Sequence, residues 1–93
     1  MNEFSDKTIN EAILLYILHN FEHLKELIKP MNDAKELLLS SENIYFKDDI
    51  RKEFIDNIKK IIVDEITIAL AIPAENVYTF LDDFNLAIFY ENN

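Results

Sequence analysis

Two histidines four residues apart, with a glutamate between them, have the spacing in this chain that best suits metal chemistry. His19, Glu22 and His23 fall in a segment with helical periodicity, where residues i and i+4 lie on one face. Both imidazoles could then reach one zinc ion, and the glutamate could serve as a general base. Catalytic zinc usually needs three protein ligands, and the sequence assigns no third one. We therefore expect a solvated polar face here, with no metal and no cofactor.

The order of residues in this segment, H-x-x-E-H, resembles the motif of the inverzincin metalloproteases. That resemblance would imply histidine ligands and a catalytic glutamate, but it covers only the five residues from His19 to His23. Asp82 and Asp83 could be read as paired catalytic carboxylates. Adjacent residues on a helix point about 100° apart, so these two do not converge on one substrate atom. We predict that the chain is not an enzyme.

Composition restricts the fold to helices joined by short polar links. The chain has 93 residues, of which 49% are hydrophobic, and it contains neither cysteine nor glycine. Without glycine, phosphate-cradling loops are excluded and tight hairpin turns are disfavoured. Without cysteine, there is no disulfide framework and no thiolate metal site. We predict one all-α domain over residues 1–93, a compact bundle of about four helices.

Apolar periodicity places the first helices. A helix is expected from Ser5, which can cap it, to Ile28, and Pro30 should end it. Asn32 can cap a short second helix over residues 33–39. A hydrophobic anchor at residues 44–46 should then precede a third helix.

The third helix is expected to begin near Asp48 and to bury Ile50, Phe54, Ile58, Ile61 and Ile62. Over residues 63–68, β-branched side chains favour a strand, whereas the spacing of the apolar residues favours a helix, which we choose.

The C-terminal third should hold one more helix and an irregular end. Pro73 suits a first helical position, and the last helix is expected over residues 74–84. Asn85 could stop it in a left-handed conformation in place of glycine. Leu86, Ile88 and Tyr90 alternate with Asn85, Ala87 and Phe89, which predicts a short strand or an extended arm over residues 86–90.

The first helix is apolar on all sides over residues 12–18. A helix of this kind is either central to the fold or covered by a partner on a second face. Both alternatives stay open, and the second would make the chain a homodimer through the first helix.

The segment from Glu65 to Leu81 resembles the helix-turn-helix of winged-helix domains. One helix ends in Ala-Leu, a short turn contains an apolar residue and Pro73, and a second helix buries Val77 and Leu81. Ala71 stands where that family usually has a turn glycine. The resemblance implies DNA binding through the second helix, with residues 86–90 as a wing strand.

Charge argues against DNA as the partner. Residues 61–93 contain six acids and no lysine or arginine, and the net charge of the chain is −9. Affinity for nucleic acid comes largely from basic side chains that displace counterions. We therefore expect a protein partner with a basic surface, bound through an acidic and aromatic face. The predicted contact residues are Glu75, Asn76, Tyr78, Thr79, Asp82, Asp83, Phe89 and Tyr90.

Three functions follow as hypotheses. The first is a non-catalytic binding module that masks a basic, nucleic-acid-binding protein, as phage-type inhibitors of host defence or transcription machinery do. The second is a dimeric winged-helix DNA-binding regulator, and the third is a bacteriocin-type immunity protein. The acidic N-terminus lacks the basic start of a signal peptide, and the longest apolar run, residues 12–18, is too short for a bilayer span. We therefore expect a cytoplasmic location and no membrane partner.

Overall fold

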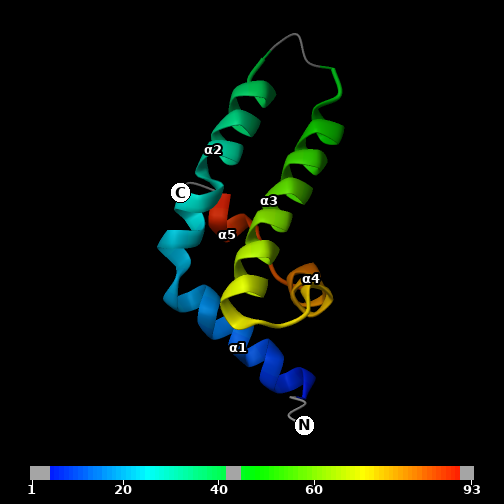
Figure 1. Cartoon of the computed structure of the whole chain (residues 1–93). Coiled ribbons are helices and arrows are strands. Elements are labelled where there is room, and N and C mark those ends of the chain that lie inside the picture. Colours follow the sequence, from blue (N-terminus) through cyan, green and yellow to red (C-terminus); the bar gives the residue numbers. More distant parts are fainter. Residues whose placement is uncertain (1–4, 42–44, 91–93) are drawn as a thin grey trace.

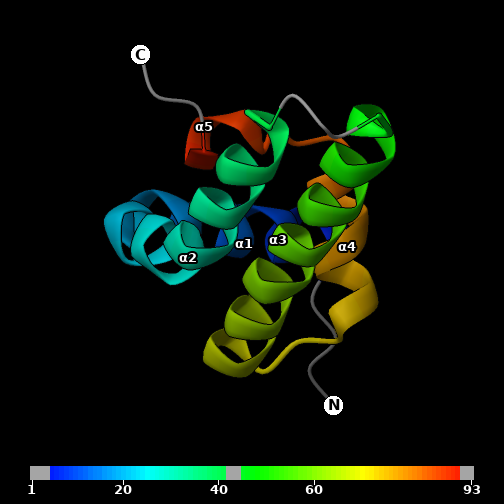
Figure 2. The same cartoon turned by 90° about the horizontal axis from the view of Figure 1, so that it is seen from above.

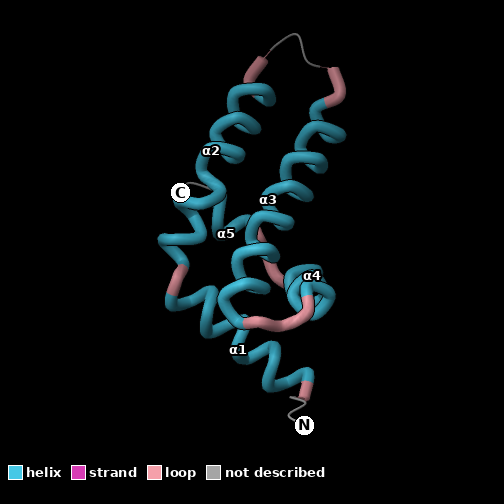
Figure 3. The backbone as a smooth tube through the Cα atoms, viewed as in Figure 1, coloured by secondary structure: helices cyan, strands magenta, loops and turns pink. Residues whose placement is uncertain are grey.

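Five helices follow one another in the computed structural model, which describes residues 5–41 and 45–90 with all their side chains except those of Ala87 and Tyr90. They are α1 (Asp6–His19), α2 (Phe21–Leu39), α3 (Lys47–Leu70), α4 (Ala74–Asp82) and the four-residue α5 (Ala87–Tyr90). The described part of the chain contains no strand (Figure 3). The prediction of an all-α bundle of about four helices is confirmed.

The helices α2 and α3 form an antiparallel hairpin that gives the molecule its long axis. They lie side by side in both views (Figures 1 and 2), and Figure 1 shows their far ends extending beyond the other helices. The principal extents are 55 × 23 × 20 Å. The helices α1, α4 and α5 pack around the opposite half of this hairpin.

One hydrophobic core joins the five helices. Each of the four longer helices contributes aliphatic side chains at three- and four-residue spacing, as a buried helical stripe requires. Leu86 and Phe89 close the core from the C-terminal end. The buried residues are Ile13, Ile17, Leu24, Ile28, Ile58, Ile62, Val63, Ile66, Val77, Leu81, Leu86 and Phe89.

The first helix is shorter than predicted because it ends at Asn20. Ser5 caps α1 as expected, since its hydroxyl accepts a hydrogen bond from the Thr8 amide. At Asn20 the backbone amide and the side-chain Nδ2 both donate to the Tyr16 carbonyl, each over 2.9 Å. A side chain that bonds the local backbone in this way competes with helical continuation. The chain therefore turns there, and α2 starts at Phe21.

The prediction that Pro30 ends a helix is wrong. Pro30 lies inside α2, which continues to Leu39, and the predicted cap at Asn32 is an interior helical residue. Ile28 is buried before the proline, and Met31 packs against the core after it. Packing on both sides thus outweighs the hydrogen bond that the proline nitrogen cannot donate.

The helical interpretation of residues 63–68 is confirmed, because α3 runs unbroken from Lys47 to Leu70. Ala71 ends it in a left-handed conformation, with φ 53° and ψ 46°. Among the described residues it is the one non-glycine residue with positive φ. The prediction of a left-handed Asn85 is therefore wrong, and the left-handed position lies at the α3–α4 turn instead.

The expected strand or arm at residues 86–90 is wrong, because this segment forms a turn and then α5. Phe89 packs its ring on Phe21 of α2, with centroids 5.2 Å apart. This contact lies within the core and favours a helical turn over an extended arm.

The predicted hydrophobic anchor is not buried where it is described. Tyr45 and Phe46 are 86% and 72% exposed at the end of the hairpin, and Ile44 lies outside the described residues. Within residues 5–41 and 45–90, no helix combines the length and the hydropathy that a membrane span requires.

Candidate partner-binding groove

The predicted contact residues centre on α4, whose sequence divides into two faces. Val77 and Leu81 are four residues apart and anchor one face in the core. Pro73 precedes the helix at its N-cap, one position earlier than predicted, and its carbonyl accepts from the Asn76 amide over 3.1 Å. The opposite face of α4 is thereby directed away from the core.

That exposed face and the start of α1 form a groove with two adjoining pockets. Asp6 and Asn10 of α1 supply one wall. The first pocket is completed by Glu75, Asn76 and Thr79, and the second, which shares Asn10 and Thr79, by Phe80, Asp83 and Phe84. We call these eight residues the α1–α4 groove. Its two walls come from the N-terminal helix and from the C-terminal third of the chain.

The α1–α4 groove is acidic. Its lining holds the carboxylates of Asp6, Glu75 and Asp83 and, among the described residues, no lysine, arginine or histidine. None of these three acids has an ion-pair partner within the described part of the chain. Unpaired carboxylates that share one concave surface attract cationic groups.

An aromatic pair adds a second kind of contact. Phe80 and Phe84 stack with their centroids 5.6 Å apart, and both line the pocket that holds Asp83. Each ring is only partly buried. A guanidinium or ammonium group held by the Asp83 carboxylate can therefore also approach an aromatic face.

Asp82 does not line the α1–α4 groove. It pairs with Lys59 of α3 and so ties α4 to the hairpin. Two other acids of the C-terminal third are also engaged, since Asp64 lies 3.4 Å from Lys60 and Glu65 lies 3.2 Å from His23. The acidic character of residues 61–93 is thus divided between internal ion pairs and the α1–α4 groove, and Glu91 lies outside the described residues.

Two of the three predicted aromatic contacts, Tyr78 and Phe89, do not line the groove. Tyr78 is partly buried and packs against the core. Phe89 is 2% exposed and contacts Phe21 and Phe84, so it belongs to the core. The side chain of Tyr90 lies outside the described part of the structure.

Sequence reasoning missed half of the groove. Glu75, Asn76, Thr79 and Asp83 were predicted, whereas Asp6, Asn10, Phe80 and Phe84 were not. The spacing of Asp6 and Asn10, four residues apart, places them on one face of α1. Nothing in the sequence indicates that this face meets α4, almost seventy residues away.

The two histidines of the H-x-x-E-H segment lie in different helices. His19 is in the last turn of α1 and His23 is in α2, so the break at Asn20 removes the single helical face on which that interpretation rests. His23 Nε2 lies 3.2 Å from Glu65 Oε2. Among the described residues, no group of three or more histidine, cysteine, aspartate or glutamate side chains is arranged to hold a metal ion.

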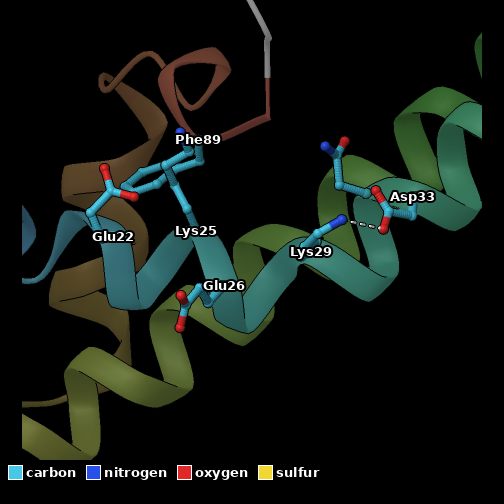
Figure 4. Close-up of a pocket in the computed structure, with 7 residues that line it drawn as sticks. Glu22, Lys25, Glu26, Lys29, Asp33 and Phe89 are labelled. Atoms are coloured by element: carbon cyan, nitrogen blue, oxygen red, sulfur yellow. Dashed lines mark hydrogen bonds and ion pairs between the residues drawn. The ribbon is translucent and has the colours of Figure 1, made fainter.

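A second hollow lies along α2 beside α5 (Figure 4). Its charges are of both signs, and Lys29 and Asp33 are paired at 2.8 Å. Lys25 lies 5.4 Å from the centre of the Phe21 ring. Because these cations are engaged locally, the hollow has no charge preference comparable to that of the α1–α4 groove.

A comparison of this chain with protein-family models, with curated proteins and with solved structures finds no match.

Proposed function

We propose that this chain is a non-catalytic protein-binding module that masks a basic, nucleic-acid-binding surface of a protein partner, in the manner of a phage-type inhibitor of host defence or transcription machinery. The α1–α4 groove is the proposed contact site. Cationic side chains of the partner would enter it and meet Asp6, Glu75 and Asp83.

The observation that carries this proposal is the convergence of three unpaired carboxylates and a stacked phenylalanine pair in one groove. Charged groups steer the encounter, and aromatic groups supply contact energy once water is excluded. Asn10, Asn76 and Thr79 add neutral oxygen acceptors between the acids. A lysine or arginine that normally contacts a phosphate would find carboxylates here instead, which is how the partner would lose its nucleic acid.

The test uses one charge reversal in the groove and one outside it. Asp83→Lys changes a groove acid that has no internal ion pair, whereas Asp82 is unsuitable because it pairs with Lys59. Glu53→Lys on the exposed surface of α3 makes the same change in net charge away from the groove. Hexa-arginine peptide serves as the first probe, with its binding sites mapped by backbone amide NMR shifts at low salt.

We expect the shifts to centre on Asn10, Asn76 and Thr79. Asp83→Lys should weaken peptide binding about tenfold or more, since hydrogen bonds to charged groups contribute about 1.5–3 kcal/mol. Glu53→Lys should bind as the unmodified chain does. The same three proteins then serve as baits in cell lysate at low and high salt. Equal weakening by both reversals, or shifts spread over all acidic residues, would contradict a specific groove.

The winged-helix DNA-binding regulator remains the alternative, based on the resemblance of residues 65–81. A left-handed residue at Ala71, where a turn glycine is expected in that family, is the feature that favours it. The exposed face of α4 argues against it, because that face presents Glu75 and Asp83 where a DNA-reading helix has basic side chains. We expect no shift of duplex DNA at low salt, and a shift abolished by salt would favour the regulator.

A further inference from the structure

Four phenylalanine rings form a row that runs from α2 through α5 to α4. The centroids of Phe21 and Phe89 are 5.2 Å apart, and those of Phe89 and Phe84 are 6.2 Å apart. Phe80 follows Phe84 at 5.6 Å. These separations are within the range of about 4.5–7 Å at which aromatic rings attract one another. Phe80 is therefore the last ring of the row.

The two ends of this row have different surroundings. At the Phe21 end, Lys25 Nζ lies 5.4 Å from the ring centroid, within the distance of about 6 Å at which a cation is attracted to an aromatic face. At the other end, Phe80 lines the second pocket of the α1–α4 groove together with Asp83, and no lysine, arginine or histidine of the described residues lines that pocket. The chain thus supplies its own cation at one end of the row and an unpaired carboxylate at the other.

The position of Asp83 also favours a cationic ligand. Asp83 is the C-cap of α4, where the last backbone carbonyls give the helix end a partial negative charge. Its neighbour Asp82 is compensated by Lys59, whereas Asp83 has no ion-pair partner in the described part of the chain. A carboxylate at this end of a helix is repelled, and a bound cation would relieve that repulsion.

We infer that the second pocket is an arginine site, in which one guanidinium group of the partner lies on the Phe80 ring and donates hydrogen bonds to Asp83. This inference rests on the proposed function and names the side chain that the partner places in the groove.

The acceptors of the pocket suit a guanidinium better than an ammonium group. The Thr79 hydroxyl donates to the Glu75 carbonyl over 2.9 Å, so its oxygen is left to accept from a ligand. Asn10 adds an amide oxygen on the opposite wall. A guanidinium has five N–H donors in one plane, so it can donate to several acceptors while its face stacks on a ring. An ammonium group is a compact, strongly hydrated charge that does not stack.

The experiment compares hexa-arginine with hexa-lysine, which have the same charge and the same number of residues. Dissociation constants are measured by calorimetry at low salt for the unmodified chain, Phe80→Leu and Phe46→Leu. Phe80→Leu keeps an apolar side chain against the core and removes the aromatic face. Phe46→Leu is the matched control, because it removes a ring that is 72% exposed at the end of the hairpin.

We expect the unmodified chain to bind hexa-arginine about two- to fivefold more tightly than hexa-lysine, as contact between a cation and a partly exposed ring implies. Phe80→Leu should remove this difference, mainly by weakening hexa-arginine, and Phe46→Leu should retain it. Circular dichroism checks that the variants keep their helices. Nuclear Overhauser effects between arginine side chains and the Phe80 ring provide a second measurement, which needs no variant.

Asp83→Asn separates binding from stability. This variant should bind hexa-arginine about five- to tenfold more weakly, since a neutral amide accepts weaker hydrogen bonds than a carboxylate. The melting temperature of the free protein should nevertheless rise by about 1–8 °C at low salt, because the repulsion at the end of α4 is removed. A lower melting temperature would mean that Asp83 stabilises the helix end, and would overturn the inference.

Two binding results would also overturn it. If the unmodified chain binds both peptides equally and Asp83→Lys weakens both, the groove binds cations without selecting arginine. If the preference for arginine survives Phe80→Leu, the guanidinium does not lie on this ring. Failure of Asp83→Lys to weaken either peptide would instead contradict the proposed function itself.

Discussion

The Tyr16 hydroxyl of α1 donates a hydrogen bond to Glu65 Oε2 of α3 over 3.2 Å. The same carboxylate oxygen lies 3.2 Å from His23 Nε2 of α2. Glu65 therefore connects three helices, close to Asn20, where α1 ends and α2 begins. Partial burial and the hydrogen bond and negative charge of Glu65 together raise the pKa of Tyr16 above its ordinary value of 10.0.

This contact predicts a loss of stability in alkali. A raised pKa means that the folded state favours the neutral phenol, so the contribution of Tyr16 is complete below pH 10 and is lost as pH rises through the folded-state pKa. The free energy of unfolding, measured by urea titration between pH 8 and 11, should fall more steeply for the unmodified chain than for Tyr16→Phe. Parallel curves for the two proteins would show that Tyr16 does not titrate with a raised pKa.

Glu65→Gln separates the two main causes of the raised pKa. Burial of Tyr16 is retained in this variant, whereas the negative charge beside its hydroxyl is removed. The pKa of Tyr16 should fall toward its ordinary value without reaching it. Ultraviolet difference titration against the corresponding Tyr16→Phe variant isolates this tyrosine from the other three. An unchanged titration would mean that the negative charge of Glu65 contributes nothing to the raised pKa.

Pro30→Ala should stabilise the protein. The proline lies inside α2 and is exposed, so alanine restores a helical amide donor without disturbing the core. We expect a gain of about 1–2 kcal/mol, less than the full cost of an interior proline because the unfolded chain also becomes more flexible. Chemical denaturation measures it. A destabilised variant would indicate that the helix ends at this residue, as the sequence alone predicts.

Ala71→Gly should also stabilise the protein. A left-handed backbone costs a residue with a β-carbon about 1–2 kcal/mol, and part of that is recovered when glycine takes its place. The expected gain is about 0.5–1 kcal/mol in the free energy of unfolding. Ala34→Gly, on the exposed side of α2, is the matched control and should lose about 1 kcal/mol. Equal losses at both positions would rule out a left-handed Ala71.

Thr67→Val tests a buried hydroxyl near the end of α3. Thr67 Oγ1 is buried and has no hydrogen-bond partner among the described residues. Valine has nearly the same shape and removes the cost of desolvating this oxygen, which is about 1–3 kcal/mol. The melting temperature should therefore rise. A lower melting temperature would show that the hydroxyl is satisfied, for instance by a bound water.

The sequence predicted helices well where apolar spacing was long and regular, and it failed where tertiary contacts decided. Continuous spacing through Ile62 and Ile66 identified α3 despite its β-branched residues. The sequence placed the end of the first helix at Pro30 and not at Asn20, because proline has a much lower helix propensity than asparagine. In the folded chain, packing around Pro30 carries the helix onward, whereas the Asn20 side chain bonds the Tyr16 carbonyl and ends α1.

The candidate site was half predictable for a related reason. Acidic residues on α4 could be recognised from composition and helical spacing, but which of two adjacent aspartates is free could not. Lys59 is far away in sequence, and only the packing of α4 on α3 brings it to Asp82 and leaves Asp83 in the groove. Phe89 was similarly assigned to the surface because its contacts with Phe21 depend on the position of α5.

The walls of the α1–α4 groove come from opposite ends of the chain, and this makes recognition a property of the completed fold. A nascent or truncated chain that lacks either α1 or α4 contains only half of the groove. Conversely, a ligand that contacts both walls would hold α1 and α4 together without a covalent bond. By mass action such a ligand would stabilise the native state by RT ln(1 + [L]/Kd), so the proposed partner would raise the resistance to unfolding as its concentration rises. In a cell, the free protein would then be the form most open to proteolysis, and occupancy of the groove would set how long the molecule survives.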